Sequence, residues 1–208
     1  MNAKQHWEKV YQEKDPVTDV SWFQAHPANS LELISATGIA KNEPLIDVGG
    51  GASVLVDRLL EAAFEYVTVL DISGAAIRHA QDRLGSRAKG VTWLEADATR
   101  FEPPHQFHLW HDRAVFHFLT KAVDRRGYVR ALKTAVPPGG HVILATFAPD
   151  GPVRCSGLPV VRYDAETIGA ELGPEFRLLE ERRESHFTPW NTEQRFRWFR
   201  FLRKPVTA

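Results

Sequence analysis

The chain has 208 residues, of which 43% are apolar and 25% charged, and its 26 basic residues balance 26 acidic ones. This length fits one sizeable domain, so we expect residues 1–208 to form a single domain. The even charge balance argues against nucleic acid as a partner, and no stretch approaches the roughly 20 apolar residues of a membrane helix. One cysteine forms no internal disulfide, and the polar N-terminus lacks the apolar core of a secretory signal. We therefore expect a cytoplasmic monomer or homodimer without a membrane partner.

Helical patterns open the chain at residues 6–11 and 30–34, and we interpret residues 1–42 as a helical lid. Five short apolar runs follow and alternate with helical patterns, which is typical of a doubly wound, mostly parallel α/β sheet of the Rossmann-like type. Residues 43–148 are therefore the predicted core. The predicted strands are residues 45–48, 67–70, 91–94, 107–110 and 142–147.

The end of the chain departs from this alternation. Residues 176–187 and 194–202 form two strand patterns joined by a loop that contains Pro189, with no helix between them, so their pairing must be antiparallel. We expect residues 149–208 to supply a substrate-side segment and this hairpin, which closes a seven-stranded sheet. The arginine-rich run from Arg195 to Lys204 fits the charged outer face of an edge strand better than a nucleic-acid site.

A glycine-rich turn, Gly49-Gly50-Gly51, follows the first strand and leads into a helix. Glycine lets a ligand approach the backbone closely, and a helix N-terminus offers free N–H groups, although a plain strand-to-helix turn has the same pattern. A dinucleotide-binding turn would need a third glycine where Val54 stands, and the carboxylate of Asp47 would repel a pyrophosphate. The same carboxylate would attract an ammonium group, so the turn favours a ligand that has one.

Acidic residues end the next two predicted strands as well. Asp71 follows Gly51 by twenty residues, at a position where a carboxylate can accept both hydroxyls of a ribose. Asp97 follows the third strand and could accept a hydrogen bond from an adenine amino group, or act only as a turn residue. Three carboxylates at three successive strand ends indicate an adenosine-containing ligand.

These segments resemble the class I S-adenosylmethionine (SAM)-dependent methyltransferases over nearly the whole chain. The resemblance lies in LIDVGGGAS at residues 45–53, VTVLDIS at 67–73, EADAT at 95–99 and PPGGHVILATF at 137–147, although Ser53 replaces a glycine that many relatives have. It implies SAM as cofactor and S-adenosylhomocysteine as product. The resemblance implies that the methionine end of SAM contacts Asp47, Gly49, Gly50 and Gly51. It also implies that the ribose contacts Asp71 and that the adenine contacts Ile72, Asp97 and Ala98.

Residues 110–119 are similar to the W-D-R-x-A-L segment of the thiopurine methyltransferase-like and small lysine methyltransferase groups. The resemblance places Asp112 and Arg113 beside the transferable methyl group, with Asp112 also counted among the cofactor contacts. An amine or alcohol acceptor needs a base, for which His111 and His117 are candidates, whereas a thiol needs at most a cation such as Arg113.

Residues 6–11 and 21–23 resemble the aromatic lid segments of the same groups. The resemblance implies that three aromatic side chains close over the cofactor, unless they only pack against a cap helix: Trp7, Tyr11 and Trp22. Among the clustered histidines, His108 and His111 would point to opposite faces of one strand, and no cysteine or carboxylate pattern completes a ligand set, so we predict no metal site. Cys155 is interpreted as a buried or incidental thiol.

The first functional hypothesis is therefore a SAM-dependent methyltransferase that acts on a small-molecule thiol, amine or hydroxyl. A protein lysine methyltransferase is the runner-up within that class. An NAD-dependent oxidoreductase and a SAM-binding regulator without catalysis are the alternatives outside it, and Val54 with the closing hairpin argues against the former.

Overall fold

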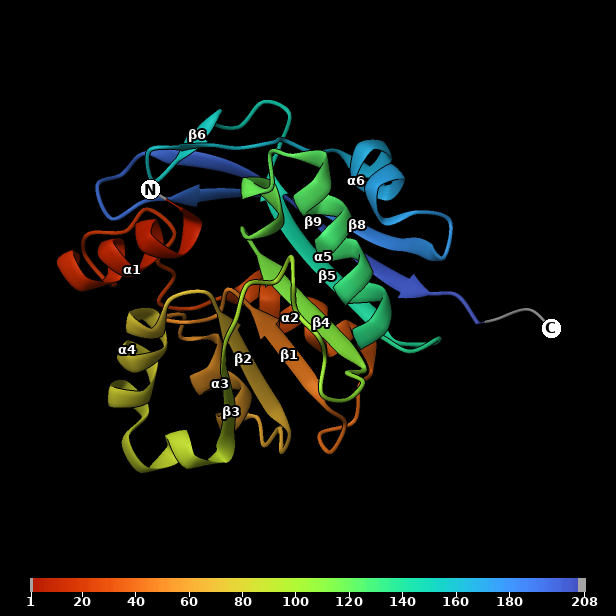
Figure 1. Ribbon diagram of the computed structural model, residues 1–208, viewed down its shortest axis with the longest axis horizontal. Helices are drawn as coiled ribbons and strands as arrows, with labels where there is room; N and C mark the ends of the chain where they lie inside the picture. The colour runs from red at the N-terminus through yellow and green to blue at the C-terminus, as the bar shows by residue number, and fades with distance from the viewer. Residues whose placement is uncertain (1, 206–208) are drawn as a thin grey trace.

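The computed structural model of the protein describes residues 2–205 and places seven strands in one sheet with helices on both faces (Figure 1). The chain begins with α1 (Ala3–Glu13) and α2 (Ala28–Thr37). The next elements are β1 (Leu45–Val48), α3 (Leu55–Glu61), β2 (Val67–Asp71), α4 (Gly74–Leu84), the 3₁₀ helix η1 (Gly85–Gly90), β3 (Val91–Glu95), β4 (Leu109–Arg113), the 3₁₀ helix η2 (Phe116–Phe118) and α5 (Ala122–Ala135). The last are β5 (His141–Phe147), β6 (Arg154–Cys155), β7 (Leu158–Pro159), α6 (Ala165–Leu172), β8 (Phe176–Phe187) and β9 (Glu193–Arg203).

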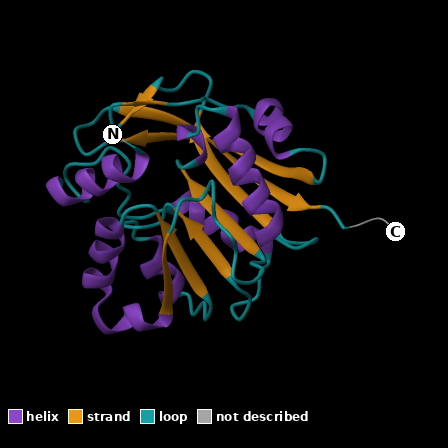
Figure 2. Cartoon of the chain, viewed as in Figure 1, coloured by secondary structure: helices purple, strands orange, loops and turns teal. Residues whose placement is uncertain are grey.

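The strand order of the sheet is β3-β2-β1-β4-β5-β9-β8. The pairs from β3 to β5 are parallel, whereas β9 pairs antiparallel with both β5 and β8. Figure 2 shows the long hairpin of β8 and β9 continuing the sheet beyond β5. The predicted fold class, a mostly parallel sheet closed by an antiparallel hairpin, is confirmed.

Side chains along each central strand alternate between two cores, because successive residues of a strand point to opposite faces. In β1, Leu45 packs with α3 and α4, whereas Ile46 packs with α5. In β4, Leu109 belongs to the first of these faces and Trp110 to the second. This alternation decides below which polar residues at the strand ends share a face.

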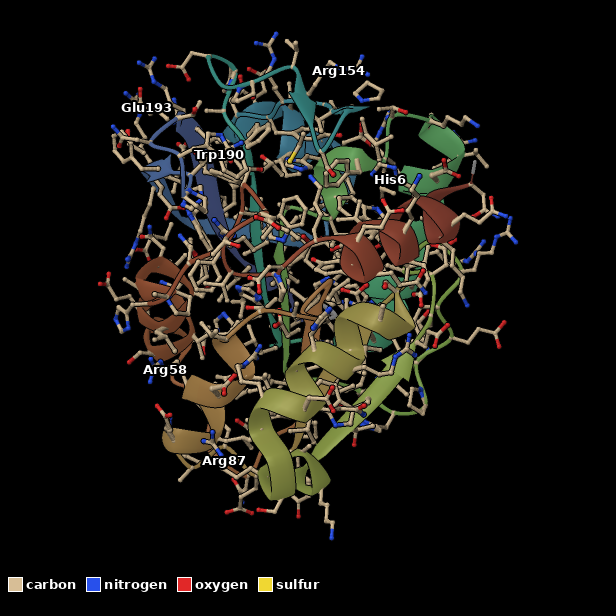
Figure 3. The ribbon with its side chains drawn as sticks, turned by 90° about the vertical axis from the view of Figure 1, so that its left-hand side faces the viewer. His6, Arg58, Arg87, Arg154, Trp190 and Glu193 are labelled. Carbon is tan, nitrogen blue, oxygen red and sulfur yellow. The ribbon has the colours of Figure 1, made fainter. Side chains whose placement is uncertain are left out.

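The N-terminal helix and the segment after β5 gather at the carboxyl edge of the sheet. Figure 3 shows His6 of α1 and Arg154 of β6 in the upper half of the molecule, whereas Arg58 and Arg87 lie toward its lower end. Trp7 and Tyr11 of α1 line the same cavity as Gly49 and Asp71, so α1 lies over the strand ends as expected for a lid. No helix within residues 2–205 combines the length and apolar character that a membrane crossing requires.

Two strand predictions were wrong in detail. The fourth strand spans Leu109–Arg113 instead of residues 107–110, because the backbone N–H groups of Phe107 and His108 donate to Ala135 and Pro44, outside the strand ladder. The arginine-rich run, except for Lys204, lies in β9, which is not an edge strand but is paired on both sides. Two of its arginines are paired with acidic residues of β8, since Arg197 bonds to Glu181 and Arg200 bonds to Glu180 at 3.1 Å.

The predicted domain boundaries stay predictions. Residue 1 and residues 206–208 of the expected domain lie outside the described part of the chain. Within residues 2–205, the expected core of 43–148 holds β1 to β5, and the expected final segment of 149–208 holds the closing hairpin.

Candidate functional site

The turn after β1 is packed so tightly that only glycine fits at its key positions. Gly49 has a φ of 72°, and a Cβ there would lie 2.1 Å from Cγ2 of Val115. A Cβ on Gly51 would lie 2.5 Å from the Cβ of Ala76 and 2.6 Å from Oδ2 of Asp71. Contacts this short are repulsive, so the glycines are required where this turn meets the β4 turn and α4.

Asp71 ends β2 and lies directly beneath this turn. Its Oδ2 accepts the N–H of Gly51 at 3.0 Å and its Oδ1 accepts the N–H of Ser73 at 2.9 Å. The side chain is buried, and burial raises the pKa of its carboxyl group to about 6. Each carboxylate oxygen can accept more than one hydrogen bond, and Asp71 and the adjacent Ile72 both line a cavity. The carboxylate can therefore accept two further donors from a ligand.

Two cavities meet at the carboxyl edge of the sheet. The larger has a volume of about 280 Å³, and the smaller one, of about 50 Å³, lies beside Asp47 and Gly50. They share the wall residues Tyr11, Trp22, Val48, Gly49 and Arg113. Of the residues predicted from the sequence, the larger cavity brings together Trp7, Tyr11, Trp22, Gly49, Asp71, Ile72, Asp97, Ala98 and Arg113, and the smaller one adds Asp47, Gly50 and His111.

Asp97 has two roles within this arrangement. Its Oδ1 accepts the backbone N–H and the hydroxyl of Thr99, both at 2.8 Å, which makes it the turn residue that the sequence also allowed. The same residue lines the larger cavity next to Ala98. The turn bonds therefore fix a carboxylate that still borders the space where we predicted the adenine.

Asp47 and His111 face each other across the β1–β4 pair, and both are buried. His111 Nδ1 lies 2.7 Å from Asp47 Oδ1, and His111 Nε2 lies 3.0 Å from the hydroxyl of Ser30 on α2. Both ring nitrogens of His111 are thus hydrogen-bonded to other side chains of the protein. Asp47 Oδ2 is buried without a hydrogen-bond partner in the described part of the chain.

Arg113 lies on the same face of β4 as His111, two residues further on. Its Nη1 donates to the backbone oxygen of Trp22 at 2.7 Å, and its guanidinium lies 5.1 Å from the ring centre of Phe196. Nε and Nη2 are buried without a partner among residues 2–205, and burial lowers the pKa of the group. Because Arg113 borders both cavities, these N–H groups can bind an anionic group of a ligand.

Asp112 lies between these two residues and faces the opposite side of the sheet. Its carboxylate accepts the N–H groups of Val115 at 2.8 Å and Phe116 at 3.1 Å, and the hydroxyl of Tyr128 at 2.5 Å. Burial raises the pKa of this carboxyl group to about 6. Asp112 does not line either cavity described here, so strand alternation places it outside the site where we predicted it.

His117 is likewise separated from both cavities. It is fully buried between Phe118 and Phe147, and its Nδ1 accepts the backbone N–H of Phe147 at 3.3 Å. Burial, and then the charge of Arg113, lower the pKa of the ring to about 3. An imidazole this weakly basic does not suit the role of general base that we predicted for it.

The predicted aromatic lid is assembled as one wall. The indole N–H of Trp22 donates to the hydroxyl of Tyr11 at 3.1 Å. Trp7 packs edge-to-face against Trp22 and Phe118, with ring centres 5.5 and 5.0 Å apart. The three residues predicted to close over a ligand therefore contact one another and border the larger cavity.

Several lining residues were not predicted as site residues. Ser30 completes the hydrogen bonds of His111, and the larger cavity is also lined by Phe118, Cys155, Leu158 and Phe196. Their apolar or neutral side chains give no chemical signal in the sequence, and only the fold brings them to the strand ends. Within residues 2–205, no group of three or more His, Cys, Asp or Glu side chains is arranged to hold a metal ion.

Comparisons with known proteins find methyltransferase domains that are similar to part of this chain. Residues 46–142 match a family model described as a methyltransferase domain. The mouse eEF1A lysine and N-terminal methyltransferase is 29% identical over 101 residues, which are 48% of this chain and only 14% of that protein. The chain therefore matches a small part of the length of that relative.

Solved structures extend the likeness to the whole chain. A protein solved for the conversion of a disulfide bond into a thioacetal group during echinomycin biosynthesis has a TM-score of 0.77 at 19% identity, covering 100% of this chain and 94% of its own. The N-methyltransferase NodS from Bradyrhizobium japonicum WM9, in complex with S-adenosylhomocysteine, has a TM-score of 0.75 at 18% identity, covering 99% and 100%.

The fold and the matched segment are similar to those of class I SAM-dependent methyltransferases, the family that the sequence resembles. SAM is the methyl donor of this class, and the residues of the site fit it. The glycine turn leaves no room for side chains, Asp71 can accept hydroxyl groups, and the unpartnered Oδ2 of Asp47 can accept an ammonium group.

Proposed function

We propose that this protein transfers the methyl group of SAM to a small-molecule acceptor. The observation that carries the proposal is one cavity with two chemically different ends. Asp71, Ile72 and Ala98 line the end near β2 and β3, whereas Arg113, Cys155 and Phe196 line the other end from β4, β6 and β9. A nucleoside at the first end leaves the second end for an acceptor.

Methyl transfer from SAM requires few catalytic groups from the protein. When bound, SAM supplies a methyl carbon already activated by positive sulfur, so the residues around it must align a nucleophile and exclude water. Trp7, Tyr11 and Trp22 form the wall that would exclude water. Asp71 would hold the ribose, and Asp97 with the Ala98 backbone would hold the adenine. Asp112 would act only indirectly, by fixing the turn after β4.

The acceptor end favours a nucleophile that arrives without its proton. No histidine lines the larger cavity within residues 2–205, whereas the cationic Arg113 does. A cation stabilises a thiolate, so a thiol acceptor needs no base, while an amine or hydroxyl acceptor would. Burial raises the pKa of Cys155 to about 11, so this thiol stays protonated at neutral pH and does not compete as an acceptor.

The segments that partly cover the cavity favour a small acceptor over a protein chain. Its walls include α1 and the segment at Leu158, which together cover the strand ends. A protein lysine methyltransferase is the second candidate, favoured by the sequence match to the mouse enzyme whose name includes that activity. A cytoplasmic location and a monomeric or homodimeric state stay predictions.

The experiment has two arms. In calorimetric titrations we expect the protein to bind S-adenosylhomocysteine and not NAD, and binding of NAD alone would contradict the proposal in favour of an oxidoreductase. Transfer of labelled methyl from SAM is then measured with panels of small thiols, small amines, small hydroxyl compounds and lysine peptides. We expect transfer to a small molecule, thiols first; transfer to peptides only would favour the second candidate, and tight binding with no transfer at all would favour a regulator.

A further inference from the structure

Ser30, His111 and Asp47 form a hydrogen-bonded chain that the transfer reaction itself does not use. It runs from α2 through β4 to β1, with distances of 3.0 Å from Ser30 Oγ to Nε2 and 2.7 Å from Nδ1 to Asp47 Oδ1. The three side chains are almost completely buried, with exposed fractions of 1%, 2% and 2%. The hydrogen-bonded chain therefore connects α2 to Asp47 of β1, two residues before the glycine turn begins at Gly49.

The direction of the hydrogen bonds follows from the donor inventory. An ionised carboxylate only accepts, so Nδ1 of His111 carries the hydrogen that binds Asp47. In the neutral ring Nε2 then accepts from the hydroxyl of Ser30. With both nitrogens bound, the ring has one orientation, and it holds Oδ1 of Asp47 in one position.

The other carboxylate oxygen of Asp47 accepts no hydrogen bond from residues 2–205. Oδ2 is buried and unpartnered, and it lies against the turn, where a Cβ on Gly50 would be only 2.2 Å away. A buried acceptor without a donor destabilises the protein, so such an atom beside a cavity points to a ligand group that completes it. Asp47 lines the smaller cavity, which adjoins the larger one at Gly49.

We propose that His111 and Ser30 are positioning residues that hold Oδ2 of Asp47 ready for the ammonium group of the cofactor's amino-acid end. This inference rests on the proposed function, because it takes SAM as the ligand. This preorganisation should increase the affinity for the cofactor, because the carboxylate loses little conformational entropy when the ammonium group binds. The charge-assisted hydrogen bond also forms in a site shielded from water. It also links cofactor affinity to α2, an element that lies ahead of the core in sequence.

The test compares two ligands. S-adenosylhomocysteine has the ammonium group, whereas 5′-methylthioadenosine has the same adenosine and a thioether but no amino-acid end. For His111→Phe, which keeps a buried ring without nitrogens, we expect calorimetric affinity for S-adenosylhomocysteine to fall by about tenfold to a hundredfold. Affinity for 5′-methylthioadenosine should stay within about twofold, which also reports that the variant is folded.

Conservative variants give the rescue. His111→Asn keeps an N–H donor close to the place of Nδ1 and should recover most of the lost affinity for S-adenosylhomocysteine. Ser30→Ala removes only the bond to Nε2 and should weaken S-adenosylhomocysteine by about threefold to tenfold. If His111→Phe does not fold, these two variants decide the proposal by the same ligand comparison. His141→Phe is the matched control. His141 begins β5, the strand next to β4, and lines neither cavity, so this variant should bind both ligands as the parent does.

A double-mutant cycle with Asp47→Asn tests whether His111 acts through Asp47. If it does, His111→Phe should add less than about twofold to the loss caused by Asp47→Asn alone. Additive losses, equal losses for both ligands, or unchanged affinity for S-adenosylhomocysteine in the folded variants would each overturn the inference. Failure of the parent protein to bind S-adenosylhomocysteine would instead overturn the proposed function, so the two failures are distinguishable.

Discussion

The turns after β2 and after β4 each bury an aspartate at the carboxyl edge of the sheet, but they use it differently. Burial raises the pKa of both carboxyl groups to about 6. Asp71 receives two backbone N–H groups and still borders the larger cavity. Asp112 receives two backbone N–H groups and the hydroxyl of Tyr128, which packs over it from α5. The same residue type at the same level of the sheet borders the cavity in one case and is enclosed by the fold in the other, because only Asp112 is covered by Tyr128.

The largest expected effect is a loss of folding stability when Asp112, and not Asp71, is replaced. Asp112→Ala leaves two buried N–H groups and the Tyr128 hydroxyl without their acceptor, so we expect the free energy of unfolding to fall by about 3–5 kcal/mol. Urea denaturation followed by circular dichroism measures this loss. The folded protein should bind S-adenosylhomocysteine within about twofold of the parent. Normal stability combined with lost binding would show that the two aspartates share one role.

A smaller effect is expected for the other aspartate, and it should appear in binding. Asp71→Ala removes the acceptor proposed for the ribose hydroxyls and should weaken S-adenosylhomocysteine by about 1–3 kcal/mol, measured by calorimetry. Its unfolding free energy should fall less than that of Asp112→Ala, since fewer side-chain donors lose their partner. Unchanged affinity for the ligand would contradict the assignment of Asp71.

The smallest expected effect is the contribution of His117, in the turn after β4, to the pH dependence of the free energy of unfolding. The folded pKa of His117 is lowered to about 3 from an ordinary value of 6.5, so the unfolded chain binds a proton that the folded chain excludes. Stability contributed by this neutral ring is therefore complete above about pH 6.5 and declines as pH falls, by about 1 kcal/mol between pH 7 and pH 5.5.

In His117→Phe this contribution is absent, so on going from pH 7 to pH 5.5 the variant should lose about 1 kcal/mol less stability than the parent loses. Asp71 and Asp112, whose folded pKa values are raised, act in the opposite sense, but both are present in variant and parent. The difference between the two unfolding curves at each pH thus isolates His117. Parallel pH profiles would mean that the ring is not kept neutral by the fold.

The positions of the residues predicted to bind the cofactor could be located from the sequence because their signals are local. The glycine turn, Asp71 and Ile72 each sit within a few residues of a strand end, and the strand patterns locate those ends. The larger cavity confirms that Asp71, Ile72 and Ala98 come together, although their contacts to a ligand stay predictions.

The β4 turn could not be predicted because its boundaries follow from packing. Polar residues such as His111 and Asp112 look like turn residues, which shifted the predicted strand toward Phe107. Once β4 reaches Arg113, alternation sends His111 and Arg113 to one face and Asp112 to the other. The sequence alone does not reveal that α5 brings Tyr128 to that second face, and so does not distinguish a ligand contact from an internal one.

The wall between the two cavities has a consequence for exchange of ligands. Trp22 is held by its indole bond to Tyr11 and by Arg113 at its backbone oxygen, and the neighbouring Ser21 oxygen accepts from His186 at 2.7 Å. A molecule leaving through this wall must break these bonds together, and cooperative opening of packed segments is slow compared with diffusion. A nucleoside that leaves by this wall would therefore have a long residence time, and loosening the Trp22 anchor would speed its release while weakening its retention.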